Sequence, residues 1–323
     1  MMDINTGGRL DIGGEDRYTV GGMRALHGGE LRGGGTVGDL NIETLHADFG
    51  ARVTGVDLDK PLAPRALDDI RRAIDRYSFL CFPGQALNDD SQLAFTRQLG
   101  EPEVEHVAYG RDGRVVYLST IGNIAEDGSQ RGNDHDMTKY STGNNMWHTD
   151  SSFRQAPTFV TITHAQEVPE QGGETEFVSA RAAYDRLPDA KRDEIAPLNV
   201  IHDYVFSRSK VAPVKQSHAD SLPPMEQRLV RTNPATGARN YYVGSHARSV
   251  VGWNDADSRA LLDDLLAKAT RSEDIYSHSW RRGDLVIWDN RCLLHRGRPY
   301  DADRYRRLMR QTRVCGAGST LRE

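Results

Sequence analysis

The segment Asp284-Leu-Val-Ile-Trp288-Asp-Asn-Arg-Cys-Leu-Leu-His295 carries most of the information on how this 323-residue chain folds. It begins with the run Val286-Ile-Trp288, whose apolar residues predict a buried strand. The strand ends in Asp289-Asn290-Arg291, and a histidine follows at position 295. A lone histidine is more often a hydrogen-bonded structural residue than a metal ligand, so His295 becomes informative only with partners elsewhere in the chain.

The partners that we predict lie in Trp147-His148-Thr149-Asp150. On an extended strand, residues i and i+2 point to the same side, so His148 and Asp150 could grip one ion from a single strand. With His295 they have the composition of a 2-His-1-carboxylate facial triad, which holds non-haem Fe(II) and leaves other coordination positions open. An H-x-D tripeptide alone is a weak signal, and the completed set indicates an oxygen-activating enzyme.

A cluster of cations follows the last histidine and includes Arg304, Arg306, Arg307, Arg310 and Arg313. Alternation along a strand would place Arg306 and Arg310 on one face, and Arg307 with Arg313 elsewhere. An arginine that faces the inside of a barrel is costly unless it meets an anion, and its planar fork suits a carboxylate. Thr175 could donate its hydroxyl to the same carboxylate.

Strands and helices alternate along the rest of the chain. We expect strands at 51–58, 79–82, 158–164, 284–288 and 307–309, and a hairpin of 228–231 with 241–243 around the turn residues 233–237. Helices are expected at 66–77, 89–99, 180–187, 189–195 and 255–270. Strands dominate the motif-bearing stretches, which predicts a mainly β protein with helical decoration, built as an antiparallel double-sheet barrel.

Composition restricts the classes of partner. The net charge of -5 argues against nucleic acid, and the chain has no apolar run long enough to span a membrane. Three cysteines without paired spacing fit a reducing, cytoplasmic location. Residues 1–39, rich in glycine, are predicted to be a flexible extension, 40–316 to be one domain, and 317–323 to be a C-terminal tail.

Three stretches together carry a family resemblance. They are Gly143-Asn-Asn-Met-Trp-His148-Thr-Asp150-Ser-Ser-Phe153, Gly172-Gly-Glu-Thr-Glu-Phe177 and Trp288-Asp-Asn-Arg-Cys-Leu-Leu-His295-Arg-Gly. In this order they resemble the taurine / 2,4-dichlorophenoxyacetate dioxygenases, which are Fe(II)- and 2-oxoglutarate-dependent oxygenases on a double-stranded β-helix, a cupin-like jelly roll. Arg181-Ala-Ala-Tyr-Asp-Arg-Leu-Pro188 and Tyr276-Ser-His-Ser-Trp280 also look like the branch that cleaves aryloxyalkanoates.

The resemblance implies roles for individual residues. His148, Asp150 and His295 would bind iron, and Thr175 and Arg306 would hold the distal carboxylate of 2-oxoglutarate. Arg310 would face the acidic group of the substrate or the cosubstrate, and Asn144 would contact substrate. His202, Ser207 and His106 are further candidates for the substrate pocket. O2 and a small organic acid complete the reaction, and a homo-oligomer is expected by likeness alone.

Other readings of the same residues remain open at this point. The substrate could be a sulfonate or another carboxylic acid rather than an aryloxyalkanoate. Two histidines and an acid also suit a zinc hydrolase, although hydrolysis has no need for the arginine cluster and Thr175. A metal-loaded barrel that senses a ligand without turnover is a third possibility, against which the intact triad argues.

Overall fold

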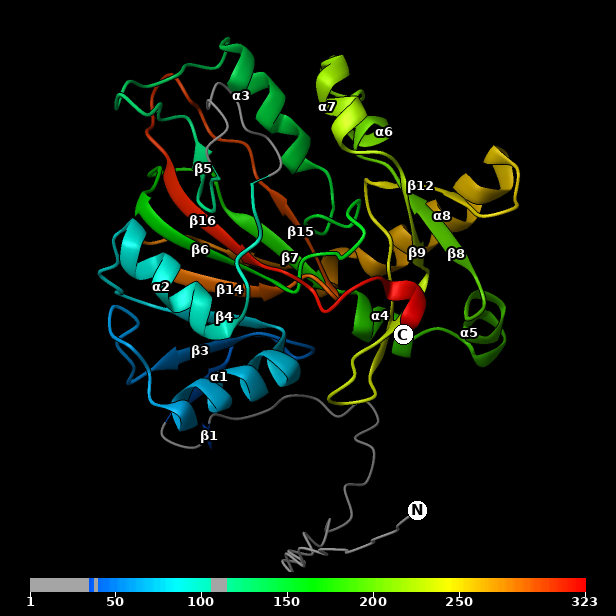
Figure 1. The fold of residues 1–323 in the computed structure, drawn as a ribbon, viewed down its shortest axis with the longest axis horizontal. Helices are drawn as coiled ribbons and strands as arrows, with labels where there is room; N and C mark the ends of the chain where they lie inside the picture. The colour runs from blue at the N-terminus through cyan, green and yellow to red at the C-terminus, as the bar shows by residue number, and fades with distance from the viewer. Residues whose placement is uncertain (1–34, 38–39, 106–114) are drawn as a thin grey trace, which may run out of the picture.

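The computed structural model describes residues 35–37, 40–105 and 115–323, and its central element is an eight-stranded sheet (Figure 1). The strand order is β1-β2-β3-β4-β14-β6-β16-β5, and all neighbours are antiparallel except the pair β3 and β4. The strands are β1 (Gly35–Val37), β2 (Leu40–Thr44), β3 (Ala51–Thr54), β4 (Phe79–Phe82), β5 (Ser119–Gly122), β6 (Val160–Glu167), β14 (Leu285–Asp289) and β16 (Leu308–Val314).

A smaller sheet of β13 (Tyr276–His278), β7 (Thr175–Ser179) and β15 (Leu293–Gly297), in that order, packs against the large one. Phe177 of the small sheet contacts Phe79 and Trp288 of the large sheet, with ring centroids 4.8 and 5.6 Å apart. Side chains from both sheets thus fill one interior, as expected for a jelly roll. The predicted double-stranded β-helix is confirmed.

Two helices cover the outer face of the large sheet, α1 (Pro64–Tyr77) and α2 (Asp89–Leu99) (Figure 1). Asn88 caps α2 by accepting a hydrogen bond from the backbone N–H of Ser91, whose hydroxyl in turn accepts one from the backbone N–H of Asn88. Ile74 and Phe95 from the two helices join Ile162 and Ile287 of the sheet in one buried core. This core holds the sheet at the back of the site.

The far side of the small sheet is covered by α4 (Ala180–Asp185) and α8 (Asp255–Ala269). Val178 and Leu294 of that sheet pack in one cluster with Leu262 and Leu265 of α8. Further elements are α3 (Asp136–Ser141), η1 (Thr142–Asn145), α5 (Asp189–Ile195), β8 (Asn199–His202), α6 (Tyr204–Arg208), α7 (Gln216–Ser221), β9 (Met225–Arg228), β10 (Val230–Thr232), β11 (Arg239–Tyr241), β12 (Ala247–Val250), η2 (Ser272–Asp274) and η3 (Thr320–Arg322).

Most of the expected elements occur with ends shifted by a few residues. The strand expected at 51–58 ends at Thr54, and the one expected at 307–309 runs on to Val314. The hairpin forms from β10 and β11. Near the C-terminus, Thr320 is buried and Glu323 forms an ion pair with Arg231, so this part of the tail is docked on the domain. None of the described helices is long and apolar enough to span a bilayer.

Replacing Phe95 by alanine should lower the free energy of unfolding by about 3–5 kcal/mol, because the ring is fully buried between α2 and the sheet. Urea denaturation followed by circular dichroism measures this change. Val115→Ala, at an apolar side chain that is 62% exposed, serves as the control and should stay within about 0.5 kcal/mol of wild type. Equal stabilities of the two variants would contradict this account of the core.

Candidate metal centre

His148, Asp150 and His295 converge inside the barrel, as the sequence predicts. Their potential ligand atoms all lie within 4.8 Å of one another. The Nε2 atoms of His148 and His295 lie 3.7 and 3.8 Å from the same oxygen of Asp150, Oδ1. The two imidazoles are buried and Asp150 is nearly so. Two nitrogens and a carboxylate oxygen around one point form a possible three-ligand metal site.

The local backbone around His148 differs from the strand that the sequence suggested. His148 forms a single β-bridge with His295, in which the His148 N–H donates to His295 O at 3.0 Å and the His295 N–H donates to His148 O at 2.8 Å. The chain then turns away, and Ser151 adopts a left-handed conformation with φ of +51°. The expectation of one extended strand bearing both ligands is therefore wrong, although the two side chains still meet.

Asn290 and Thr161 hold Asp150 in place. The Asn290 side chain accepts a hydrogen bond from the Asp150 N–H at 3.0 Å and donates one to the Thr161 hydroxyl at 2.8 Å. Thr161 in turn donates to Asp150 Oδ2 at 2.6 Å, which leaves Oδ1 directed at the histidines. Such outer contacts fix the orientation of a ligand before the metal arrives. Sequence reasoning missed both residues, although Asn290 stood in the quoted segment.

The protonation states suit metal binding. Burial lowers the pKa of His148, and burial together with the neighbouring His148 lowers the pKa of His295 to about 3, so both imidazoles are neutral near pH 7. Burial disfavours the charged form of Asp150, but the imidazoles, Arg313 and the Thr161 hydroxyl outweigh it and its pKa is lowered. The His148 Nδ1 lies 2.7 Å from Met146 O, a partner that keeps its proton there and frees Nε2 for a metal.

Arg306 and Arg310 lie on the outer face of the large sheet, which corrects their predicted roles. Arg306 is 42% exposed and pairs with Glu167, and Arg310 pairs with Asp89 of α2. Arg310 lies on the face of β16 that packs on α2, and Arg306, two residues before that strand, lies at the surface against Glu167. Neither guanidinium points into the interior in this structure.

Arg307 occupies the interior position instead. It is buried, its Nε has no hydrogen-bond partner, and no ion pair with a described acidic residue forms. The Gly173 backbone lies close to this side chain, since a Cβ on Gly173 would be 3.5 Å from the Arg307 Nε. Thr175, two residues after Gly173, accepts a hydrogen bond from Trp280 Nε1 at 2.9 Å. Burial lowers the pKa of Arg307, the mark of a cation without an anion. The side chain is therefore suited to bind a carboxylate brought in by a ligand.

The remaining residues predicted to contact substrate are Asn144, Ser207, His202 and His106. Asn144 accepts a hydrogen bond from Arg208. Ser207 is linked to the triad through His246, since its Oγ lies 2.7 Å from Nδ1 of His246, whose ring centroid is 6.0 Å from that of His148. His202 is fully buried against Tyr242 at a ring distance of 5.0 Å, which fits packing rather than substrate contact. His106 lies outside the described residues.

A second trio, Cys81, His278 and Asp284, also brings possible ligand atoms within 4.8 Å of one another. All three residues are buried, and His278 Nε2 lies 3.3 Å from Asp284 Oδ2. Burial raises the pKa of the Cys81 thiol to about 12, so the thiol is protonated. A buried histidine–aspartate pair beside a thiol accounts for this group without an ion.

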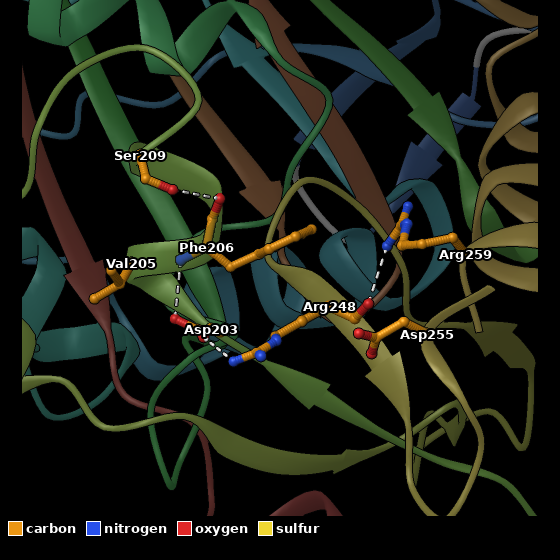
Figure 2. Close-up of a pocket in the computed structure, with 7 residues that line it drawn as sticks. All are labelled: Asp203, Val205, Phe206, Ser209, Arg248, Asp255 and Arg259. Atoms are coloured by element: carbon orange, nitrogen blue, oxygen red, sulfur yellow. Dashed lines mark hydrogen bonds and ion pairs between the residues drawn. The ribbon is translucent and has the colours of Figure 1, made fainter.

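A surface pocket of about 360 Å³ lies beside α6, and no triad residue lines it (Figure 2). Its lining residues are Asp203, Val205, Phe206, Ser209, Arg248, Asp255 and Arg259. Arg248 pairs with Asp203 at 3.2 Å, and Arg259 donates to Ala247 O and pairs with Asp263. The charges of both arginines are thus already matched. The pocket lacks the metal-ligand set that the barrel interior offers.

A jelly roll that brings two buried histidines and an aspartate together in its interior indicates a class of protein, the metal-dependent enzymes with a facial-triad site. Comparison with known proteins then identifies the family. The model of the taurine catabolism dioxygenase TauD, TfdA family matches residues 41–312, and the chain belongs to this family. Membership confirms the predicted enzyme class, an Fe(II)- and 2-oxoglutarate-dependent dioxygenase, over the zinc hydrolase and the non-catalytic barrel.

Individual relatives are similar over nearly their whole length. The chain is 37% identical to the alpha-ketoglutarate-dependent 2,4-dichlorophenoxyacetate dioxygenase of Burkholderia sp. (strain RASC), covering 84% of this chain and 94% of that protein. It is 34% identical to the (S)-phenoxypropionate/alpha-ketoglutarate-dioxygenase of Sphingobium herbicidovorans, covering 86% and 95%. The crystal structure of AAD-2 with Mn(II) and N-oxalylglycine is 36% identical, with a TM-score of 0.79 and coverage of 87% and 98%.

Asp150→Ala should weaken metal binding by about 100-fold or more and abolish turnover, because it removes one of three ligands while the barrel core is untouched. Equilibrium dialysis with Fe(II) or Mn(II) under anaerobic conditions gives the affinity. Asp134→Ala removes a fully exposed carboxylate that lies outside the triad and serves as the control. Metal binding by Asp150→Ala at the wild-type level would rule out the triad as the metal centre.

Proposed function

We propose that this dioxygenase hydroxylates a small aryloxyalkanoate, of the 2,4-dichlorophenoxyacetate kind, next to its ether oxygen. The proposal is supported by the relatives named for 2,4-dichlorophenoxyacetate and (S)-phenoxypropionate, which match most of the chain at 37% and 34% identity. A taurine dioxygenase structure from Burkholderia xenovorans matches at 28% identity with a TM-score of 0.69. The higher identities favour the aryloxy acids over sulfonates as substrates.

The residue roles that we propose follow the geometry of the interior. His148, Asp150 and His295 hold Fe(II), and Arg307 with Thr175 holds the distal carboxylate of 2-oxoglutarate. The buried Arg307 without an acidic partner is the observation that carries this assignment, because a desolvated cation gains most from a bidentate carboxylate. Thr175 has its hydroxyl oxygen held by Trp280 Nε1, so its own hydrogen remains available to donate.

The protein contributes binding and orientation. Neutral imidazoles and an ionised Asp150 present the donor set that the metal requires, and Asn290 and Thr161 keep it in place. His295 packs on Trp288 and Phe177, with ring centroids 4.8 and 5.9 Å apart, so apolar rings exclude water from one side of the ligands. When bound, Fe(II) and 2-oxoglutarate would let O2 act as the oxidant, with one oxygen atom going into succinate as the cosubstrate loses CO2 and the other into the new hydroxyl group of the substrate.

Hydroxylation beside an ether oxygen determines the products. The carbon that gains the hydroxyl becomes a hemiacetal carbon, whose bond to the aryl oxygen breaks when the hydroxyl proton moves to that oxygen. The products are a phenol and an oxo acid. Residues of this chain need only place the C–H of the substrate near the open side of the metal, since the collapse of a hemiacetal needs no further catalyst in principle.

Assays with the Fe(II)-loaded protein test the substrate class. With 2-oxoglutarate and O2, 2,4-dichlorophenoxyacetate should yield succinate and a phenol in equal amounts, because each hydroxylation consumes one cosubstrate. Taurine and a simple alkanoate of similar length are the comparison substrates. Succinate coupled to taurine and not to any aryloxy acid would overturn the proposed substrate while leaving the dioxygenase class in place.

Arg307→Ala should raise the apparent KM for 2-oxoglutarate by about 100-fold, as loss of a charge-assisted bidentate contact predicts. Arg306→Ala, its neighbour on the outer face, is the matched control and should change the KM by less than about twofold, because Arg306 pairs with Glu167 at the surface. Steady-state kinetics at saturating substrate give both values. A large effect of Arg306→Ala with a small one of Arg307→Ala would restore the assignment made from sequence.

We also propose that the protein is cytoplasmic and forms a homo-oligomer. The three cysteines are all free, which supports a reducing cytoplasm. A homo-oligomer is proposed only because of the family likeness. Size-exclusion chromatography with light scattering measures the number of subunits directly.

A further inference from the structure

The arginines around the triad differ in whether an acidic residue of the protein matches their charge. Arg313 pairs with Glu103 and Glu105 at 3.1 and 3.2 Å. Arg296, which follows the ligand His295, pairs with Glu176 at 2.7 Å. These cations are neutralised from within the fold. No described acidic residue pairs with Arg307, and by our proposal the distal carboxylate of 2-oxoglutarate pairs with it instead.

Arg208 is a second arginine without such a partner. It ends the short helix α6, and no ion pair links it to a described acidic residue. Its guanidinium donates to Asn144 Oδ1 at 2.7 Å and to Tyr140 O at 3.4 Å. It also lies against the rings of Tyr140 and Tyr204, with centroid distances of 5.3 and 5.6 Å, and its buried Nε has no hydrogen-bond partner.

These contacts hold the guanidinium firmly. The two tyrosine hydroxyls lie 2.5 Å apart and form a hydrogen bond, which ties α3 to α6 around the cation. A Cβ on Gly143 would collide with the guanidinium, so the backbone of η1 approaches it closely. Neutral oxygens and ring faces orient a cation but leave its charge unmatched. An arginine fixed in this way is preorganised for an anion that arrives from outside.

Arg208 also lies on the triad side of α6. Ser207, its neighbour in α6, has its Oγ 2.7 Å from Nδ1 of His246, and the ring centroid of His246 lies 6.0 Å from that of His148. Asn144, its hydrogen-bond partner, precedes His148 by four residues. The outer side of α6, with Val205 and Phe206, instead lines the surface pocket where Arg248 is paired (Figure 2).

We propose that Arg208 binds the acidic group of the organic substrate, with Asn144, Tyr140 and Tyr204 as its positioning residues. This inference rests on the proposed function only in taking the substrate to be an organic acid. Arg307, directly before β16, and Arg208, at the end of α6, then form two separate anion sites, one for the cosubstrate and one for the substrate. The separation allows each acid to be recognised by its own cation.

The substitution Arg208→Gln tests the proposal, since glutamine keeps hydrogen-bond donors and removes the charge. The protein is loaded with Mn(II) and 2-oxoglutarate, and the acid that supports the highest succinate yield in wild type is titrated in by calorimetry. We expect about 10- to 100-fold weaker binding of the acid, with 2-oxoglutarate affinity within about twofold of wild type. Arg208→Lys keeps the charge without the fork and should give an intermediate loss.

Two controls separate substrate binding from a structural role. Arg248→Gln removes an arginine of β12 that pairs with Asp203 beside the surface pocket, and it should leave acid binding unchanged. The methyl ester of the same acid has no charge, so wild type and Arg208→Gln should bind it equally. Equal losses for acid and ester, or no loss for the acid, would overturn the proposal.

The outcomes also separate this proposal from that for the substrate class. If a sulfonate or another acid replaces the aryloxy acid as the best substrate, only the substrate class fails and the titration uses that acid. If wild type accepts only uncharged substrates, the role of Arg208 fails. If an aryloxy acid is turned over and Arg208→Gln binds it as tightly as wild type, only the role proposed for Arg208 is wrong.

Discussion

The site depends on the reciprocal pair of backbone hydrogen bonds between His148 and His295. His148 lies in the connection between η1 and β6, and His295 lies in the middle of β15, so the bridge brings distant parts of the chain together. A single bridge is enough because His295 is already fixed by its pairing with Phe177 of β7. The bridge fixes the two imidazoles relative to each other before any metal binds, which reduces the entropy lost on binding.

Asn290 connects this bridge to the large sheet. It follows β14 directly, accepts from the Asp150 N–H and donates to Thr161 of β6, while its carbonyl accepts from the Thr149 hydroxyl at 2.9 Å. One buried amide thereby satisfies polar groups on the loop and the sheet together. Because unpaired buried polar groups are costly, this network and the ligand geometry form or fail as a unit.

The sequence predicted that His148, Asp150 and His295 would meet, but it did not place the arginines. Residue types and spacing identify His148, Asp150 and His295, since few other combinations of these side chains suit one metal. The sequence does not show which face of β16 lies inside the barrel, because Leu308 and Met309 are both apolar and alternation could bury either face. Only the packing of Thr312 and Val314 on the α2 side shows that Arg307 lies inside and Arg310 outside.

By our two proposals, the arginines without an acidic partner are those that bind the two acids. A buried guanidinium without a counter-charge destabilises the ligand-free fold, and it gains most from a ligand that brings a carboxylate. Arg313 differs, because Glu103 and Glu105 pair with it in the ligand-free fold. Its charge also helps to lower the pKa of Asp150. By our proposals, Arg307 and Arg208 make the ligand-free fold less stable, and binding of an acid at each arginine offsets this loss.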